Sequence, residues 1–296
     1  MPNILVTTDF SDKSKAALYF AIQLANQIDC TLTFIHVGHI LTPTAWNIKR
    51  IESHIAEQTI SIRQKLNLFV EKIYTSLQLP ATDLNCIVRI SVFPEAVIRQ
   101  YAANNAFDFI CISTRGAGKL ERVFGTNTAN LISKSSVPVI AVPYKYKPMT
   151  IKSIMYASDL EHFESEILNV VGFARPLGAA VELVHFKTAS DSKDSLAAIE
   201  KDVRKTADYE MDFTVVNRGS ENSIAGDIES AIKKSKPSMI IMFTDQSRNF
   251  FQKVFLSSKS EEYTFNAKIP LLAFSKPQLP VENMIASGSV PDVHTT

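Results

Sequence analysis

The chain has 296 residues, of which 46% are hydrophobic, and this is enough to bury one large core or two ordinary ones. Lys and Arg total 31 against 30 for Asp and Glu, so no strong field of one sign draws the whole protein to nucleic acid or to an anionic membrane. We therefore expect a globular protein with no nucleic-acid partner and no membrane partner.

The charge is divided unevenly between the two halves of the chain. Residues 1–149 carry 15 basic and 10 acidic side chains, a formal charge of +5, whereas residues 150–296 carry 16 and 20, a charge of −4. An anionic ligand is therefore expected to prefer the first half.

Cysteine usage and the N-terminal residues bear on the compartment. Cys30, Cys86 and Cys111 are widely spaced and form no CxxC pair, which argues against a disulfide framework and a thiolate metal site. The N-terminal residues lack the basic stretch and long apolar run of a signal peptide, and the longest apolar segment elsewhere is interrupted by charge and proline. These features predict a cytoplasmic protein.

The first half of the chain alternates short apolar runs with longer amphipathic stretches. ILVTT (4–8) predicts a buried strand, and Ser11 can cap a following helix whose apolar residues recur on one face as far as Ile28. TLTFIHV (31–37) is typical of a central parallel strand, and residues 44–78 carry apolar residues at helical spacing.

Three further strands and two helices complete this half. LNCIVRI, DFICIST and VPVIAVP predict strands, and helices are expected at about 94–104 and 126–134. The order β-α-β-α-β-α-β-α-β predicts an α/β fold with an open, doubly wound, mainly five-stranded parallel sheet flanked by helices.

The same plan recurs in the second half. ILVTTDF returns as IMYASDL and TFIHV returns as ELVHF, which aligns Asp9 with Asp159 and His36 with His185. VPVIAV returns as IPLLAF (269–274) at a shorter offset, so the second copy is expected to have lost about one long helix's worth of chain between its second and third strands. We therefore predict two tandem domains, 1–146 and 150–277, and a poorly ordered tail, 278–296.

The stretch STRGAGKLERVFGTNTAN (113–130) follows the fourth predicted strand and leads into a helix. Gly116 and Gly118 let the backbone approach a ligand closely, and Gly125 removes a side chain at the helix entrance. Ligands of open α/β sheets collect at the carboxyl ends of the strands, and a helix N-terminus favours an anion. From the residues alone two interpretations stay open: a phosphate cradle, or a tight turn with a solvated basic rim.

Several familiar sites are absent from the sequence. No GxxxxGK[ST] occurs and no GxGxxG follows the first strand, so neither a P-loop NTPase nor a Rossmann dehydrogenase fits. His36 and His39 form an HxxH pair without a nearby cysteine or carboxylate, so we predict no metal site and a structural role for the imidazole of His36. No nucleophile and base pair appears, and we predict no catalytic residues.

Taken together, ILVTTDFSDKSKAALYFAIQLA, LTFIHV, the glycine stretch, GTNTANLISKSSVPVIAVP and the repeated plan resemble a tandem universal stress protein over nearly the whole chain except the tail. The resemblance implies a fold like that of the adenine nucleotide alpha hydrolases and a regulatory role in the stress response. It implies that the first domain binds ATP or another adenine nucleotide. It also implies a pseudo-dimer, in which the domains pair through their last strands, and a homodimer of chains as a further partner.

The resemblance also implies roles for individual residues. It makes Asp9 a contact to the ribose or adenine, places the adenine near the backbone of Thr7 and Val37, and puts the phosphates against the glycine loop. The residues expected to bind nucleotide are Thr7, Asp9, Val37, Ser113, Arg115, Gly116, Gly118, Gly125, Thr126 and Asn127.

The loop departs from the family pattern of Gly, two residues, Gly, nine residues, Gly, Ser or Thr. Ser113 stands in place of the first glycine, and eight residues separate Gly116 from Gly125. Two other functions are therefore weighed beside nucleotide binding: a scaffold that binds a small molecule or protein without nucleotide, and a nucleotide-hydrolysing enzyme.

In the second copy, bulky or acidic residues occupy the corresponding positions. Phe243, Asp245, Gln246 and Ser257 stand where the first copy has Ser113, Arg115, Gly116 and Gly125. Because a carboxylate repels phosphate, we expect the second domain to be structural.

Overall fold

The computed structural model describes residues 1–114, 126–187, 191–218, 224–244 and 269–275. The first half contains β1 (Asn3–Thr7), α1 (Lys15–Ala25), β2 (Thr31–Gly38), α2 (Ile48–Ser76), β3 (Asn85–Ile90), α3 (Pro94–Asn104), β4 (Phe109–Thr114), α4 (Thr126–Lys134) and β5 (Val139–Pro143). The second half contains β6 (Ser153–Ser158), α5 (Phe163–Leu177), β7 (Ala180–Lys187), α6 (Lys193–Ala207), β8 (Met211–Asn217), α7 (Ile224–Ser235), β9 (Met239–Thr244) and β10 (Leu271–Ser275).

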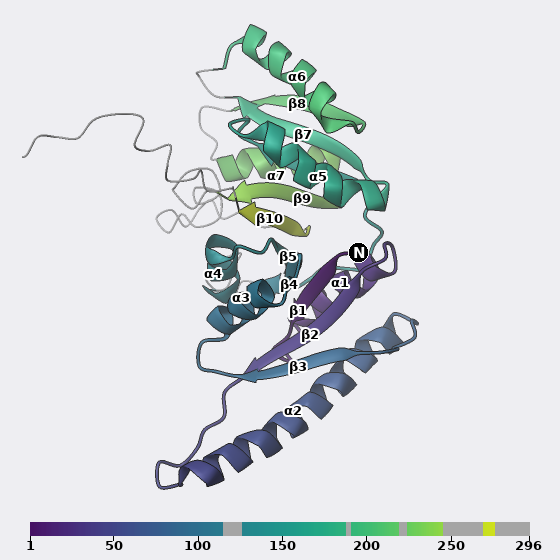
Figure 1. Ribbon diagram of the computed structural model, residues 1–296. Coiled ribbons are helices and arrows are strands. Elements are labelled where there is room, and N and C mark those ends of the chain that lie inside the picture. The colour runs from purple at the N-terminus through teal and green to yellow at the C-terminus, as the bar shows by residue number, and fades with distance from the viewer. Residues whose placement is uncertain (115–125, 188–190, 219–223, 245–268, 276–296) are drawn as a thin grey trace, which may run out of the picture.

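All the described strands form one sheet, in the order β3-β2-β1-β4-β5-β10-β9-β6-β7-β8 (Figure 1). Each half contributes five parallel strands in the same internal order, and the halves join where β5 and β10 pair antiparallel, with Leu271 opposite Ala141. The doubly wound α/β fold predicted from the sequence is confirmed. The pairing of the two last strands, on which the pseudo-dimer prediction depends, is also observed.

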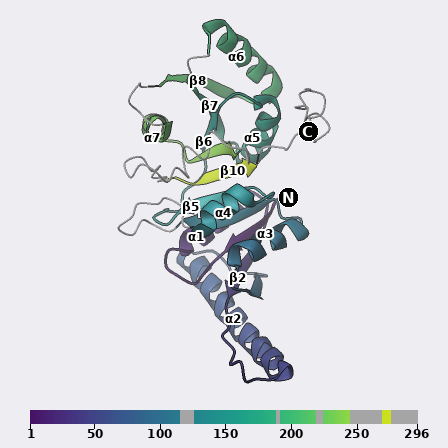
Figure 2. The same ribbon diagram turned by 90° about the vertical axis from the view of Figure 1, so that its left-hand side faces the viewer.

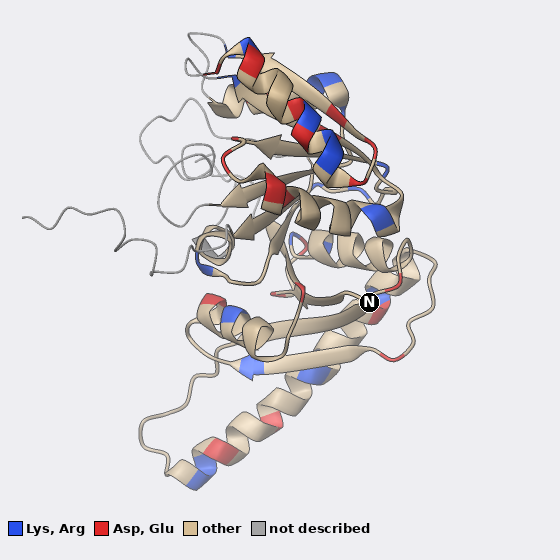
Figure 3. Cartoon of the chain, turned by 45° about the horizontal axis from the view of Figure 1, so that its top comes forward, with Lys and Arg blue, Asp and Glu red and all other residues tan. Residues whose placement is uncertain are grey.

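Helices cover both faces of this sheet (Figure 2). One hydrophobic core contains buried residues of α1, α2, α5 and α6, and a second contains those of α3, α4 and α7. Strands covered on both sides need continuous apolar sequence, which explains why all six residues of β9 and all five of β5 are buried. Most strands accordingly carry no charged residue, and the charges gather on helices and connections (Figure 3).

The helix α2 is longer than the sheet that it covers. Its buried residues, Leu66, Val70 and Ile73, all belong to its second half, whereas Ile48 is 73% exposed. The first half of α2 therefore projects past the edge of the sheet, as Figures 1 and 2 show.

Aromatic side chains connect the two halves across the β5–β10 junction. Phe243 of β9 stacks on Phe274 of β10 with ring centroids 5.0 Å apart, and Phe109 of β4 packs edge-on against Phe274 at 6.3 Å. Phe109 also meets Phe173 of α5 edge-on at 5.5 Å. Such pairs add to the hydrophobic free energy of burial, so the halves share a continuous core.

Two details differ from the sequence-based expectations. The first helix begins at Lys15, with Ser14 as its N-cap, and the hydroxyl of Ser11 instead accepts a hydrogen bond from the Ser14 amide at 3.2 Å within the preceding turn. The chain missing from the second half is part of a helix and not a whole element: α6 is kept, and its 15 residues compare with 29 in α2. The shorter offset therefore reflects a trimmed helix, because a long crossover is needed between parallel strands.

In the part of the chain that the structure describes, no helix is both long and apolar enough to span a bilayer.

Gln27, just after α1, fastens the first domain to the segment that leads into β6. Its Nε2 donates to the carbonyl of Ile151 at 2.7 Å, and its Oε1 accepts from the Ile151 amide at 2.9 Å. We expect Gln27→Ala to lower the free energy of unfolding by about 1–3 kcal/mol, because two backbone groups of the buried Ile151 lose their partner. Urea unfolding measures this. Gln27→Glu keeps the acceptor but not the donor, so its free energy of unfolding should lie between those of the parent and Gln27→Ala. A Gln27→Ala variant as stable as the parent would contradict a stabilising role for these two hydrogen bonds.

The three cysteines are free thiols in apolar surroundings. Burial raises the pKa of Cys30 and Cys86 to about 11 and raises that of the fully buried Cys111 further. Because the thiolate is the reactive form, we expect a disulfide reagent at about pH 8 to label Cys111 only after unfolding, and the other two slowly. Counting labelled thiols by mass with and without denaturant tests this, and fast labelling of Cys111 in the folded protein would show the prediction to be wrong.

Candidate functional site

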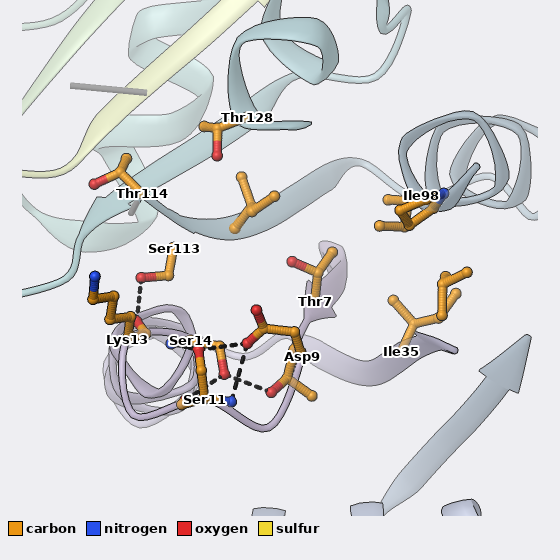
Figure 4. Close-up of a pocket in the computed structure, with 14 residues that line it drawn as sticks. Thr7, Asp9, Ser11, Lys13, Ser14, Ile35, Ile98, Ser113, Thr114 and Thr128 are labelled. Atoms are coloured by element: carbon orange, nitrogen blue, oxygen red, sulfur yellow. Dashed lines mark hydrogen bonds between the residues drawn. The ribbon is translucent and has the colours of Figure 1, made fainter. Parts of the chain in front are cut away.

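A pocket lies at the carboxyl ends of β1, β2 and β4 in the first domain, where ligands of doubly wound sheets collect (Figure 4). Its cavity volume is about 230 Å³. Residues from the turn before α1, from the start of α3 and from α4 complete its lining. The pocket therefore sits at the N-terminal ends of three helices, where the backbone favours negative charge.

The turn between β1 and α1 is shaped by short side chains. Phe10 has a φ of 64°, in the left-handed region, and its amide donates to Thr8 Oγ1 at 3.1 Å. The same hydroxyl is 2.8 Å from Ser14 Oγ. These local bonds stabilise the left-handed conformation that turns the chain back into α1.

Asp9 follows β1 and belongs to this turn. Its Oδ1 accepts hydrogen bonds from the amide of Ser11 at 3.0 Å and from the Ser11 hydroxyl at 2.5 Å. This Asx-type turn fixes the exposed carboxylate at the rim of the pocket.

Ser113 and Lys13 meet on the opposite side of the pocket. The Ser113 hydroxyl donates to the backbone carbonyl of Lys13 at 2.5 Å, which ties the end of β4 to the turn before α1. Ser113 is among the residues expected to bind nucleotide, and in the structure the proton of its hydroxyl is already engaged by the protein. Lys13 itself lines the pocket, with its Nζ 5.9 Å from the ring centroid of Tyr144.

The pocket is polar on one side and aliphatic on the other. Figure 4 shows Ile35 and Ile98 at one end, and Lys13, Ser113 and Thr114 at the other. A ligand with an apolar ring at one end and an anionic group at the other matches this division.

The structure brings together four of the residues expected from the sequence: Thr7, Asp9, Val37 and Ser113 all line the pocket. Arg115, Gly116, Gly118 and Gly125 lie outside the described residues, and the side chains of Thr126 and Asn127, at the start of α4, do so as well. How these six contribute to a site stays a prediction.

Sequence reasoning missed other lining residues, among them Lys13, Ser14, Ile98 and Thr128. Lys13 could have been found, because it lies within a few residues of Asp9 in the loop that follows the first strand. Ile98 could not, because nothing in a helical apolar pattern tells which residue faces the end of the sheet.

His36 connects β2 to the turn that carries Asp9. Its Nδ1 lies 2.9 Å from the carbonyl oxygen of Thr8, which can only accept, so Nδ1 carries a proton. The ring packs against Phe10 with centroids 4.3 Å apart. This is the structural role expected of this imidazole, and no group of three His, Cys, Asp or Glu side chains that could hold a metal ion occurs within the described ranges.

The turn after β6 in the second domain repeats this geometry. Leu160 has a φ of 66° and donates its amide to Ser158 Oγ at 3.0 Å, while the Glu161 amide donates to Asp159 Oδ1 at 3.1 Å. His185 Nδ1 lies 3.1 Å from the Ser158 carbonyl, as His36 does from that of Thr8.

The end of β9 differs from the end of β4. Phe243, the counterpart of Ser113, is 5% exposed and belongs to the hydrophobic core that the two halves share. Asp245, Gln246 and Ser257 lie outside the described residues.

The sheet order and the pocket define a doubly wound α/β protein with a cavity at the carboxyl ends of its strands, where ligands of such folds bind. Within that class, residues 1–143 match the sequence model of the universal stress protein family.

Two solved structures support the fold over nearly the whole chain. A universal stress protein from Archaeoglobus fulgidus DSM 4304 matches 93% of this chain and 96% of its own at 16% identity, with a TM-score of 0.61. A protein of unknown function from Pseudomonas aeruginosa PAO1 matches 97% and 95% at 11% identity, with a TM-score of 0.56. A universal stress protein from Archaeoglobus fulgidus in complex with dAMP covers 43% of this chain and 98% of its own at 14% identity, with a TM-score of 0.30. Among curated proteins, none matches the chain.

The half-buried His36 makes stability depend on pH. Burial lowers its pKa below the ordinary value of 6.5, although the bond to Thr8 and the charge of Asp9 oppose this shift. The stabilisation is therefore complete above pH 6.5 and is lost as the pH falls toward the folded-state pKa, because only the unfolded chain binds the proton there.

We expect His36→Asn to keep a donor for the Thr8 carbonyl but not to titrate. Between about pH 7.5 and about pH 5.5 its free energy of unfolding should fall less than that of the parent. Urea unfolding at both pH values is the measurement, and an equal fall in the two proteins would contradict the account.

Proposed function

We propose that the first domain binds an adenine nucleotide in the pocket at the ends of β1, β2 and β4, and that the protein acts as a regulator in the stress response rather than as an enzyme. The observation that carries the proposal is that one end of this pocket is aliphatic and the other is lined by hydroxyl groups and the ammonium group of Lys13. The carboxylate of Asp9 is held in place in the turn between β1 and α1.

The aliphatic end suits a purine. Ile35, Val37 and Ile98 present apolar surface to a flat base, and exposed backbone groups at the ends of β1 and β2 can read its edge. The Asp9 carboxylate is an acceptor for ribose hydroxyls, and its bonds to Ser11 fix its position in advance.

The polar end suits phosphates. Lys13 supplies positive charge, and Thr114 and Thr128, which flank the glycine stretch in sequence, both line this pocket. The α4 N-terminus adds its partial positive charge at the same place. The volume of about 230 Å³ is slightly below the roughly 300–1,000 Å³ of common ligand sites.

A regulatory role accords with the chemistry of the described lining. Among the described lining residues there is one carboxylate, Asp9, which accepts hydrogen bonds from Ser11, and one ammonium, Lys13, but no imidazole and no thiol. Turnover of ATP that a second substrate accelerates would overturn this part of the proposal.

The second domain is structural in this proposal. Phe243 stands at the position of Ser113 with its ring stacked on Phe274. A side chain of the core thus occupies space that a ligand would need there.

Calorimetric titration of ligand-stripped protein with ATP, ADP and AMP tests the proposal. We expect Asp9→Asn to weaken binding by about tenfold or more, because a charge-assisted hydrogen bond to the ligand is lost, while the amide oxygen still accepts from Ser11. Asp159→Asn is the matched control, because Asp159 makes the same turn in the second domain, and its affinity should equal that of the parent.

Gly125→Val probes the glycine stretch separately and should abolish binding if the backbone there meets the phosphates. Identification by mass of the small molecule that co-purifies completes the experiment. No heat with any of the three nucleotides would favour a scaffold that binds other molecules without nucleotide.

A further inference from the structure

A second, apolar pocket lies at the junction of the two domains, between α1 and α5. Its floor is formed by the first residues of β1 and β4 and by the end of β10, and its walls by the last part of α1 and by α5. Its cavity volume is about 210 Å³. It lies at the ends of β1 and β4 opposite to the proposed nucleotide pocket, beside the N-terminus of the chain (Figure 1).

The chemistry of this junction pocket is that of a site for an uncharged ring. Phe109, Phe173 and Phe274 all line it, and Phe109 meets each of the other two edge-on. Among its described lining residues none carries a charge, and Leu168, 63% exposed, stands at the mouth. A charged ligand would lose hydration without gaining a partner here.

Gly172 leaves part of the wall open. It lies inside α5, where glycine costs helix stability relative to alanine. A Cβ at this position would meet nothing within 4 Å, and the residue has no left-handed φ that would require glycine. Gly172 is exposed, so the open space beside it is the mouth of the pocket, and the lack of a side chain lets an occupant reach the helix backbone there.

Pro176 lies one turn further along the same wall. Proline has no N–H, so the carbonyl of Gly172 is deprived of its usual donor four residues later. This carbonyl thus lacks its helical partner on the exposed side of α5, where Asn169 is the other polar residue of the described lining.

We propose that the junction pocket binds a small, neutral aromatic molecule of about the size of indole, with its ring edge-on to the phenylalanines and its N–H donated to the Gly172 carbonyl. An enclosed cavity of about 150 Å³ holds benzene in another protein, so this pocket, which opens to solvent along α5, has a large enough volume at about 210 Å³ for a fused bicyclic ring. Because the pocket takes residues from both domains, the ligand stabilises their pairing and links their association to the concentration of a small molecule.

Titration of the full chain with indole, followed by calorimetry and by the thermal unfolding midpoint, tests the proposal. We expect saturable binding and a midpoint that rises with indole concentration. Indene, which lacks the N–H, should bind about three- to tenfold more weakly, and the anionic indole-3-acetate more weakly still.

The variants Gly172→Leu and Gly172→Ala locate the site. Both should fold at least as stably as the parent, since the added Cβ meets open space and both residues favour helix. A leucine side chain on a helix leans over the preceding turn, toward Leu168, so it fills the pocket and should weaken indole binding by about tenfold or more. Alanine should leave most of the affinity.

Three outcomes would overturn the proposal: no indole-dependent shift in the parent, undiminished affinity in Gly172→Leu, or binding that appears only after residues 278–296 are removed. The last would make the chain's own tail the occupant. Asp9 does not line the junction pocket, so Asp9→Asn should bind indole as tightly as the parent. This proposal and the nucleotide proposal can therefore be tested independently.

Discussion

The architecture depends on the antiparallel pairing of β5 with β10. Each half is a five-stranded parallel sheet whose inner strand is apolar on both faces, and such a strand cannot be left with an open edge in water. Pairing the two edges satisfies their backbone groups and turns two sheets into one of ten strands. The contact between the halves extends beyond the strands themselves, through the stacked rings of Phe243 and Phe274 and the two hydrogen bonds between Gln27 and Ile151. The junction pocket between α1 and α5 exists only because the pairing brings these helices onto one face.

The two halves show how one turn can be kept while the site beside it changes. Thr8, Asp9 and His36 recur as Ser158, Asp159 and His185, with the same bonds and the same left-handed residue between them. These bonds close the connection between strand and helix, so they are needed wherever the fold is. The position of Ser113 is not under this constraint, and in the second half it is taken by a ring that belongs to the core. A conserved-looking aspartate in such a repeat is therefore weak support for a ligand by itself.

Most of the fold could be predicted from the sequence because strands buried on both faces have continuous apolar sequences. The helix at 94–104 could be placed to the residue, since Pro94 marks its first turn. The start of α1 was placed too early because Ser11 and Ser14 are equally good caps in sequence, and only the left-handed Phe10 decides between them. For the candidate site, Thr7, Asp9, Val37 and Ser113 could be predicted because strand ends converge at one edge of a parallel sheet. Ile98 and Thr128 reach the pocket from helices, and their orientation depends on tertiary packing that no local pattern records.

The order of the strands in the chain has a consequence for synthesis. β5 ends at Pro143, but its partner β10 begins only at Leu271, so 128 residues must be added before the inner edge of the first sheet can close. At roughly 5–20 residues per second, a ribosome needs about 6–26 s for this. During that interval a nascent first domain presents an apolar, unpaired edge that an identical edge on a neighbouring nascent chain of the same polysome could cover. The second domain thus also has a role in folding, because it carries, within the same chain, the strand β10 that pairs with this edge.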